Sequence, residues 1–299
     1  MMIPCAKYMA GFIDADGFLS LRTRIGARPD MAVEVAQRAK YADVIYRYKT
    51  SFGGHIREGC IRGGYYVSYA ARGCIANMLI DCLSPHFICK HKFANSLVRL
   101  AQESSVLHRE KDVEAVRKSL DALRHRPPGP DGNLSISGGW LAGYFDGDGS
   151  FTIKVCKKTG YAYPVAAILS APQYCCGIRT LRGAFGGAIC RTGGNILWQL
   201  QLSKPSNAQN FLRYFIEYLV IKRAQAQFLL GCATAGNFRD GSAIRNAIMT
   251  LNSSQEKSSN PDNEAAALLN KIRFDKPMRP LGRPPGRIET RPRQMRQPS

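Results

Sequence analysis

The segments "YMAGFIDADGFLSL" (residues 8–21) and "WLAGYFDGDGSFTI" (residues 140–153) repeat one pattern within a single chain of 299 residues. Each begins with small and apolar residues at helical spacing, continues with two aspartates and a glycine, and ends in an alternating run that is typical of a strand. Further landmarks recur at the same interval. Asp16 and Asp148 are 132 residues apart, as are Lys90 and Lys222, and "FGGHI" returns as "FGGAI" 133 residues later. The chain is therefore predicted to contain two halves built on one plan.

Hydrophobic periodicity changes in the same order within each half: helix, two strands, helix, two strands, helix. This predicts an α+β fold with two pseudo-symmetric αββαββα halves, which meet at the paired motif helices and form a saddle of antiparallel sheets. The predicted boundaries are a first half over residues 1–126, a Pro- and Gly-rich linker over 127–137 and a second half over 138–250. Residues 251–299, which are rich in Arg and Pro, are predicted to form a flexible basic tail.

The motif residues predict how the halves join. Ala10 and Gly11, with their equivalents in the second motif, leave room for two helices to cross closely. Gly17 and Gly149 are expected to supply unrestricted backbone conformations where each helix gives way to a strand. Such a crossing brings Asp16 and Asp148 together at the carboxyl ends of the helices.

A carboxylate at a helix carboxyl end is disfavoured by about 0.3–1 kcal/mol, and a second carboxylate nearby adds repulsion. A positive charge between the two aspartates is therefore expected. Hard divalent cations take oxygen ligands, and Mg²⁺ suits a site that serves phosphodiester displacement.

Other classes of site fit the sequence poorly. An EF-hand calcium loop needs glycine at loop position six and glutamate at position twelve, and neither motif has this spacing. The five histidines are scattered, without zinc-ligand or histidine-nuclease spacing. The ten cysteines form no Cys-x-x-Cys pair and are interpreted as reduced core residues. No apolar run approaches the roughly 20 residues that cross a bilayer.

The charge of the chain indicates a polyanionic partner. The formal net charge is +20 and the pI is about 9.8, and basic residues remain abundant outside the tail. Polar and basic residues line one face of the predicted strands, as expected of a β-ribbon in the major groove of double-stranded DNA. The predicted DNA-contacting residues are Ser20, Arg22, Arg24, Arg28, Glu34, Arg57, Thr152, Lys154, Lys158, Arg191, Gln199 and Gln201.

The two motifs, the repeated halves and the late lysine of each half resemble the double-motif, monomeric LAGLIDADG homing endonucleases over roughly residues 5–245. The resemblance implies a site-specific endonuclease that makes metal-dependent double-strand breaks with 3′ overhangs in a long, asymmetric target. Mg²⁺ would support cleavage, and Ca²⁺ would support binding with little cutting.

The resemblance also assigns site residues. Asp16 and Asp148 match the metal-binding acids, and Ala15 and Gly147 match the positions that offer backbone carbonyls to the metal. Lys90 and Lys222 match the basic residues that orient water near the scissile phosphates. Gln37 matches a polar position that holds solvent, and Ser170 takes this place in the second half. The earlier aspartates, Asp14 and Asp146, are assigned mainly to structure.

Two other functions stay open. An RNA maturase would use the same fold to assist splicing, with host intron RNA as partner. A DNA-binding remnant without cleavage would be indicated by loss of one motif acid, and both acids are present. The absence of a recognisable targeting segment leads us to expect either a protein encoded in an organelle, chloroplast or mitochondrion, or one of a prokaryotic cytoplasm.

Overall fold

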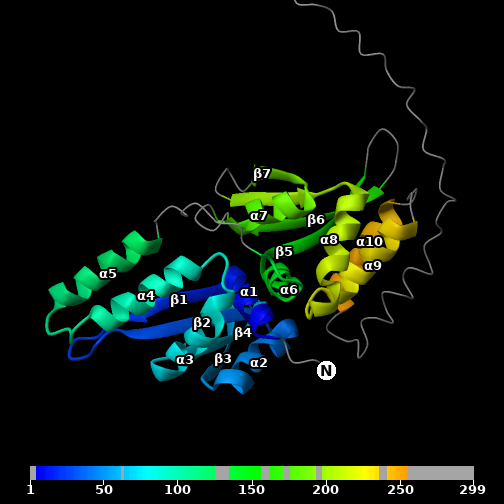
Figure 1. The fold of residues 1–299 in the computed structure, drawn as a ribbon. Helices are drawn as coiled ribbons and strands as arrows, with labels where there is room; N and C mark the ends of the chain where they lie inside the picture. The colour runs from blue at the N-terminus through cyan, green and yellow to red at the C-terminus, as the bar shows by residue number, and fades with distance from the viewer. Residues whose placement is uncertain are drawn as a thin grey trace, which may run out of the picture.

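The computed structural model describes residues 5–61, 64–124, 135–155, 162–171, 176–192, 197–235 and 241–254. These ranges contain two four-stranded antiparallel sheets, with strand orders β1-β2-β4-β3 and β5-β6-β8-β7. The sheets lie on either side of a central pair of helices, α1 and α6 (Figure 1). The predicted α+β class and the division into two related halves are confirmed.

Both halves follow the predicted order αββαββα. The first half contains α1 (Ala6–Asp16), β1 (Gly17–Arg22), β2 (Asp30–Arg38), α2 (Ala42–Phe52), β3 (His55–Ile61), β4 (Gly64–Arg72) and α3 (Cys74–Leu83). The second contains α6 (Gly138–Asp148), β5 (Gly149–Val155), β6 (Ala162–Ser170), α7 (Cys176–Phe185), β7 (Ala188–Thr192), β8 (Leu197–Leu202) and α8 (Pro205–Phe215). Two helices extend each half: α4 (His91–Glu103) and α5 (Glu110–Arg124), then α9 (Arg223–Ala235) and α10 (Gly241–Ser254).

The repeated Phe-Gly-Gly marks the same tight connection in both halves. Gly53 and Gly54 have φ of +79° and +88°, and Gly186 and Gly187 have φ of +73° and +99°. Residues with a side chain rarely adopt positive φ, so each connection from helix to strand depends on a pair of glycines.

The motif helices α1 and α6 cross at backbone contact, as the small residues predict. A Cβ atom on Gly11 would lie 2.0 Å from the carbonyl oxygen of Trp140, and one on Gly143 would lie 1.9 Å from that of Tyr8. The same glycine in each motif therefore faces the first turn of the opposite helix.

The expectation for the glycines after the acidic pairs is wrong. Gly17 and Gly149 both have φ of −81°, in ordinary extended backbone. Glycine is required at both positions because there is no space for a Cβ atom. A Cβ atom on Gly17 would lie 2.7 Å from the Ile13 carbonyl oxygen, and one on Gly149 would lie 2.4 Å from that of Phe145.

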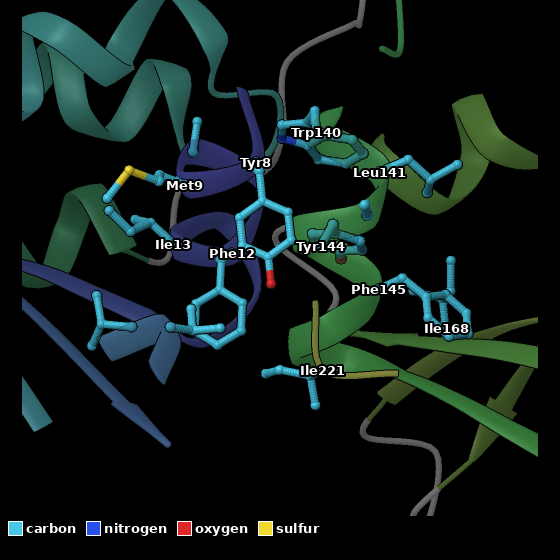
Figure 2. Packing of buried hydrophobic residues seen from close by; sticks show 14 of the residues in the cluster. Tyr8, Met9, Phe12, Ile13, Trp140, Leu141, Tyr144, Phe145, Ile168 and Ile221 are labelled. Carbon is cyan, nitrogen blue, oxygen red and sulfur yellow. The ribbon is translucent and has the colours of Figure 1, made fainter. Parts of the chain in front are cut away.

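One hydrophobic core runs through both halves. It includes Tyr8 and Phe12 of α1 and Trp140 and Phe145 of α6, all buried. Figure 2 shows side chains from the two helices meeting in this core. The sheets are thereby fixed on either side of one shared helix pair.

Some sequence features remain as predicted or unplaced. In the ranges that the structure covers, the cysteines are free thiols, and none of the helices there is long and apolar enough to span a membrane. Lys158, most of the predicted linker and nearly all of the predicted tail lie outside the described residues.

Candidate functional site

The first aspartate of each motif is a buried structural acceptor. The Asp14 carboxylate accepts hydrogen bonds from three consecutive backbone N–H groups before α4, those of Ile88, Cys89 and Lys90, at 2.7, 3.1 and 2.8 Å. Asp146 accepts from Val220, Ile221 and Lys222 before α9, at 2.8, 3.0 and 2.9 Å. Burial raises the pKa of both carboxyl groups, and these hydrogen bonds oppose the rise because they favour the ionised form.

Each of these carboxylates also receives a donor from the opposite half. Trp140 donates its Nε1–H to Asp14 at 2.8 Å, and Tyr8 donates its hydroxyl to Asp146 at 2.7 Å. Tyr8 and Trp140 occupy equivalent positions in the two motifs. The pair of cross-half hydrogen bonds therefore obeys the pseudo-symmetry, and it gives Asp14 and Asp146 the structural part that the resemblance implied.

The two late lysines cap the carboxyl ends of the motif helices. Lys90 Nζ donates to the carbonyl oxygens of Ile13 and Gly17 at 2.5 and 2.7 Å. Lys222 Nζ donates to those of Phe145, Asp146 and Gly147 at 2.8, 2.6 and 3.2 Å, which occupies all three of its N–H groups. Burial lowers the pKa of both ammonium groups. This geometry makes them positioning groups for the helix ends, and a direct part in orienting water stays a prediction.

The carboxyl ends of α1 and α6 meet at Ala15 and Gly147, and Asp16 and Asp148 are the next residues along each helix. A Cβ atom on Gly147 would lie 2.5 Å from the Ala15 Cβ and 3.2 Å from the Asp16 Oδ2. Both carboxylates are partly exposed, in contrast to Asp14 and Asp146.

The electrostatics show that these two carboxylates interact. Burial and then the negative charge of Asp16 raise the pKa of Asp148 to about 6. Burial also raises the pKa of Asp16, against the lowering effect of Lys222 and then Lys90. The predicted juxtaposition of the acids at the helix ends, with positive charge nearby, is present in the fold.

The donors at this point suit a hard cation. Among the described residues, no group of three or more His, Cys, Asp or Glu side chains is arranged to hold a metal ion. The available ligands are the two carboxylates and the backbone carbonyls of Ala15 and Gly147, all oxygen, with water to complete the shell as Mg²⁺ prefers. The Gly147 carbonyl accepts one long hydrogen bond from Lys222, and its second lone pair remains for another partner.

The surroundings of the two acids are unequal. Gln37 and Ser170 take equivalent places, each two residues beyond the strand partner of the glycine that follows the motif. Gln37 donates its Nε2–H to Asp16 Oδ2 at 3.1 Å. The shorter Ser170 donates to the Ala171 carbonyl at 3.2 Å instead, and no hydrogen bond reaches the Asp148 carboxylate from within the described ranges.

A cavity of about 500 Å³ lies beside Asp148 where the second half lacks the longer glutamine. Its wall comes from both halves and includes Phe18, Lys90, Arg124, Asp148 and Ser170. The catalytic candidates are thus open to solvent on the Asp148 side.

The strand register places most predicted first-half contact residues on one polar sheet face. Direct cross-strand partners share a face. Ser20, Arg22, Glu34 and Arg57 fall on the face of Phe18, which is half exposed. Arg22 forms a 3.9 Å ion pair with its partner Asp30. Arg24 and Arg28 are exposed in the connection between β1 and β2.

Four further residues of this face were missed from the sequence. They are Arg38, Tyr66, Ser68 and Arg72, which the register aligns with the predicted set. The Nε of Arg72 is buried without a hydrogen-bond partner. The pairing of β2 with β4 is the observation that identifies these residues. Alternation within one strand divides its residues between two faces, but it does not show which of these faces joins the polar face of the neighbouring strand.

The polar face of the second half contains Thr152, Lys154, Gln199 and Gln201. Lys154 Nζ donates to Gln201 Oε1 at 2.8 Å, and the amide of Gln201 donates to that of Gln199. These side chains form a connected row of donors and acceptors.

Arg191 lies apart from the other predicted contact residues of the second half, and its contact with DNA stays a prediction. It pairs directly with Trp198, on the sheet face that also contains buried Leu200. Its guanidinium lies 5.0 Å from the centre of the Trp198 ring, so it covers an aromatic side chain at the end of the core face.

Comparisons with known proteins find structural likeness without sequence relatives. No family model matches the chain, and no curated protein matches it. The structure is similar to that of I-SmaMI bound to uncleaved DNA target in the presence of calcium ions, with a TM-score of 0.58, 18% identity and coverage of 89% of this chain and 97% of that one.

Two further solved structures extend this likeness. The LAGLIDADG homing endonuclease I-GzeII in complex with its DNA target gives a TM-score of 0.54 at 15% identity, covering 90% of this chain and 98% of that one. I-SmaMI bound to cleaved DNA gives 0.56 at 16% identity, covering 89% and 95%. The alignments extend over both halves, and at these identities they establish the architecture. The chain has the double-motif LAGLIDADG homing endonuclease fold.

Proposed function

We propose that the protein is a site-specific DNA endonuclease of the homing type, which makes a metal-dependent double-strand break and leaves 3′ overhangs. The observation that carries the proposal is the convergence of Asp16 and Asp148, one from each half, between two sheets with polar faces. The proteins of similar fold in complex with DNA targets support a DNA partner.

The residues around the two acids have different proposed roles, in metal binding and in positioning. Asp16 and Asp148, with the carbonyls of Ala15 and Gly147, would hold divalent cations. A Mg²⁺ ion held by these groups would supply positive charge that stabilises the negative charge on a phosphate during displacement. Lys90 and Lys222 fix the carbonyls of the helix ends, so the acids keep their positions without a metal. Gln37 orients the Asp16 carboxylate.

The two polar sheet faces would follow the major groove on either side of the acids. Their side chains differ: Arg, Ser and Glu line the first face, and Lys, Thr and Gln line the second. A long target with unequal half-sites follows from this difference, because each side-chain type pairs with its own base edges. One chain supplies both motifs, so the active species is a monomer.

Purified protein tests the proposal on a duplex that is selected from randomised DNA by repeated binding in Ca²⁺. With Mg²⁺, a plasmid that carries this duplex is expected to become linear, with 3′ extensions at the ends. With Ca²⁺, the duplex is expected to be bound and left mostly intact, because Ca²⁺ accepts a looser ligand geometry.

Two outcomes count against the proposal. Undiminished cleavage in excess chelator would rule out the metal requirement. Tight binding of the selected duplex with no cleavage in Mg²⁺ or Mn²⁺ would favour a DNA-binding protein without nuclease activity.

A further inference from the structure

Two of the described residues that line the cavity beside Asp148 are basic, Lys90 and Arg124. The proposed chemistry gives no role to Arg124. The Lys90 ammonium is buried and donates to two helix-end carbonyls. Arg124 is the last residue of α5, and its side chain retains about a third of its exposure, at 34%.

The Arg124 guanidinium is held in a defined position. It lies 5.1 Å from the centre of the Phe18 ring, and its Nη1 contacts Asp121 Oδ1 at 3.3 Å. A guanidinium has five N–H donors, and the Asp121 contact uses one of them. An arginine that is stacked on an aromatic ring loses less freedom when it binds an anion, and its planar fork matches the oxygens of a phosphate.

Phe18 places this guanidinium on the DNA side of the sheet. Phe18 directly follows the Asp16-Gly17 turn, and it shares the polar face with Ser20 and Arg22. Arg124 therefore borders the cavity that Asp148 lines and also contacts the polar face at Phe18, so a DNA backbone that follows this face to the acids would pass near it.

Among the residues of the second half that the structure describes, there is no counterpart to this arrangement. The position equivalent to Phe18 is Ser150. Helix α10 packs against β5 and α9, but its last turn contains no basic residue, unlike that of α5. The acid on the other side, Asp16, has Gln37 as its neighbour. The Arg124 guanidinium is therefore close to one of the two acids, Asp148, and has no equivalent beside the other among the described residues.

We propose that Arg124 binds a backbone phosphate of one DNA strand at the catalytic centre and accelerates cleavage of that strand alone. This inference rests on the endonuclease function that is proposed above. It makes α5 part of the active site, although α5 lies outside the αββαββα unit, and it predicts that the two strands depend on different residues.

The test compares Arg124→Gln with Lys118→Gln, which removes an equal charge from an exposed position on the same helix. The selected duplex is labelled on each strand in turn and cleaved by excess enzyme in Mg²⁺. In Arg124→Gln, cleavage of one strand is expected to slow by about 10- to 100-fold, the range for a lost hydrogen bond to a charged group. The other strand is expected to stay within about twofold, and nicked plasmid accumulates.

Arg124→Lys keeps the charge without the planar fork and is expected to restore part of the rate. Lys118→Gln is expected to cut both strands at the wild-type rate. Thermal melting of each variant confirms that it is folded, and loss of packing alone would not slow one strand selectively.

Equal slowing of both strands, or no slowing of either, would overturn the assignment of Arg124 while wild-type cleavage leaves the endonuclease function in place. Failure of the wild-type protein to cut either strand would instead remove the proposed function, and this inference with it.

Discussion

In each motif a single residue lies between a carboxylate that the protein holds firmly and the carboxylate that is the candidate metal ligand. Asp14 and Asp146 each receive three backbone N–H groups and one donor from the opposite half. Asp148 has no such donors within the described ranges, and it lies near Asp16 at the negative end of a helix. The protein therefore satisfies the first pair fully, whereas in the second pair Asp16 receives one side-chain donor, from Gln37, and Asp148 receives none within the described ranges.

The first prediction compares these two kinds of acid. Asp148→Asn is expected to abolish double-strand cleavage, to leave DNA binding within a few-fold, and to keep or raise the melting temperature without metal, since it removes a repulsion. The matched variant Asp146→Asn turns an amide N–H toward backbone N–H groups and is expected to cost about 1.5–3 kcal/mol or more. Thermal melting in chelator and gel-shift assays measure both. If Asp148→Asn unfolds, or cuts both strands normally, the shared metal site is wrong.

The second prediction concerns pH. The pKa of Asp148 is about 6 in the folded protein, against an ordinary value of 3.8. The folded state thus holds this proton more tightly than the unfolded state. The resulting stabilisation is complete below about pH 4 and is lost as the pH rises through 6.

In chelator, the melting temperature of Asp148→Asn relative to wild type is therefore expected to rise between pH 4 and pH 7, by an amount equivalent to at most about 3 kcal/mol. A pH-independent difference would show that the pKa of Asp148 is not raised in the metal-free folded protein. Cleavage in Mg²⁺ is expected to fall below about pH 6, because the carboxylate must be ionised to bind the cation.

At the scale of elements, the α1–α6 crossing determines where the acids lie. The crossing is as close as two backbones allow, because a glycine in each helix faces a carbonyl of the other. Any side chain at these glycines meets backbone, which moves only if the two halves move with it.

Gly143→Ala is accordingly predicted to destabilise the protein by about 1–3 kcal/mol or more and to weaken DNA binding and cleavage together. Gly183→Ala in α7 is the matched control, because a Cβ atom there meets nothing within 4 Å. It is expected to be neutral or stabilising by up to about 1 kcal/mol, through helix propensity. Chemical denaturation measures the free energy of unfolding of both variants. Equal changes in the two would contradict the close crossing.

Local pattern and repetition were enough to predict the αββαββα order of each half, and the family resemblance supplied the equivalence of Gln37 and Ser170. They were not enough for features that depend on pairing or on the path of a loop. Arg191 lies in a short strand whose face is set by its register with β8. The extended backbone of Gly17 follows from crowding against the preceding helical turn. The carbonyl contacts of Lys222 follow from the route of the segment before α9.

At the scale of the whole molecule, the halves share one core and exchange hydrogen bonds between Tyr8 and Asp146 and between Trp140 and Asp14. Neither sheet has a core of its own that is separate from the helix pair. The two halves are therefore predicted to unfold together in one transition by calorimetry, with equal calorimetric and van't Hoff enthalpies. Two resolved transitions would mean that the halves are independent domains.

Ala15 and Gly147 occupy equivalent places in the two motifs, and they touch. A methyl group at Gly147 would stand 2.5 Å from that of Ala15, too close for two carbon atoms. Two copies of the first half, placed in this same crossing, would set alanine against alanine, whereas two copies of the second half would set glycine against glycine. The helix ends of a first-half homodimer would therefore have to move apart at the point where the two acids meet, which the pairing of unlike halves avoids.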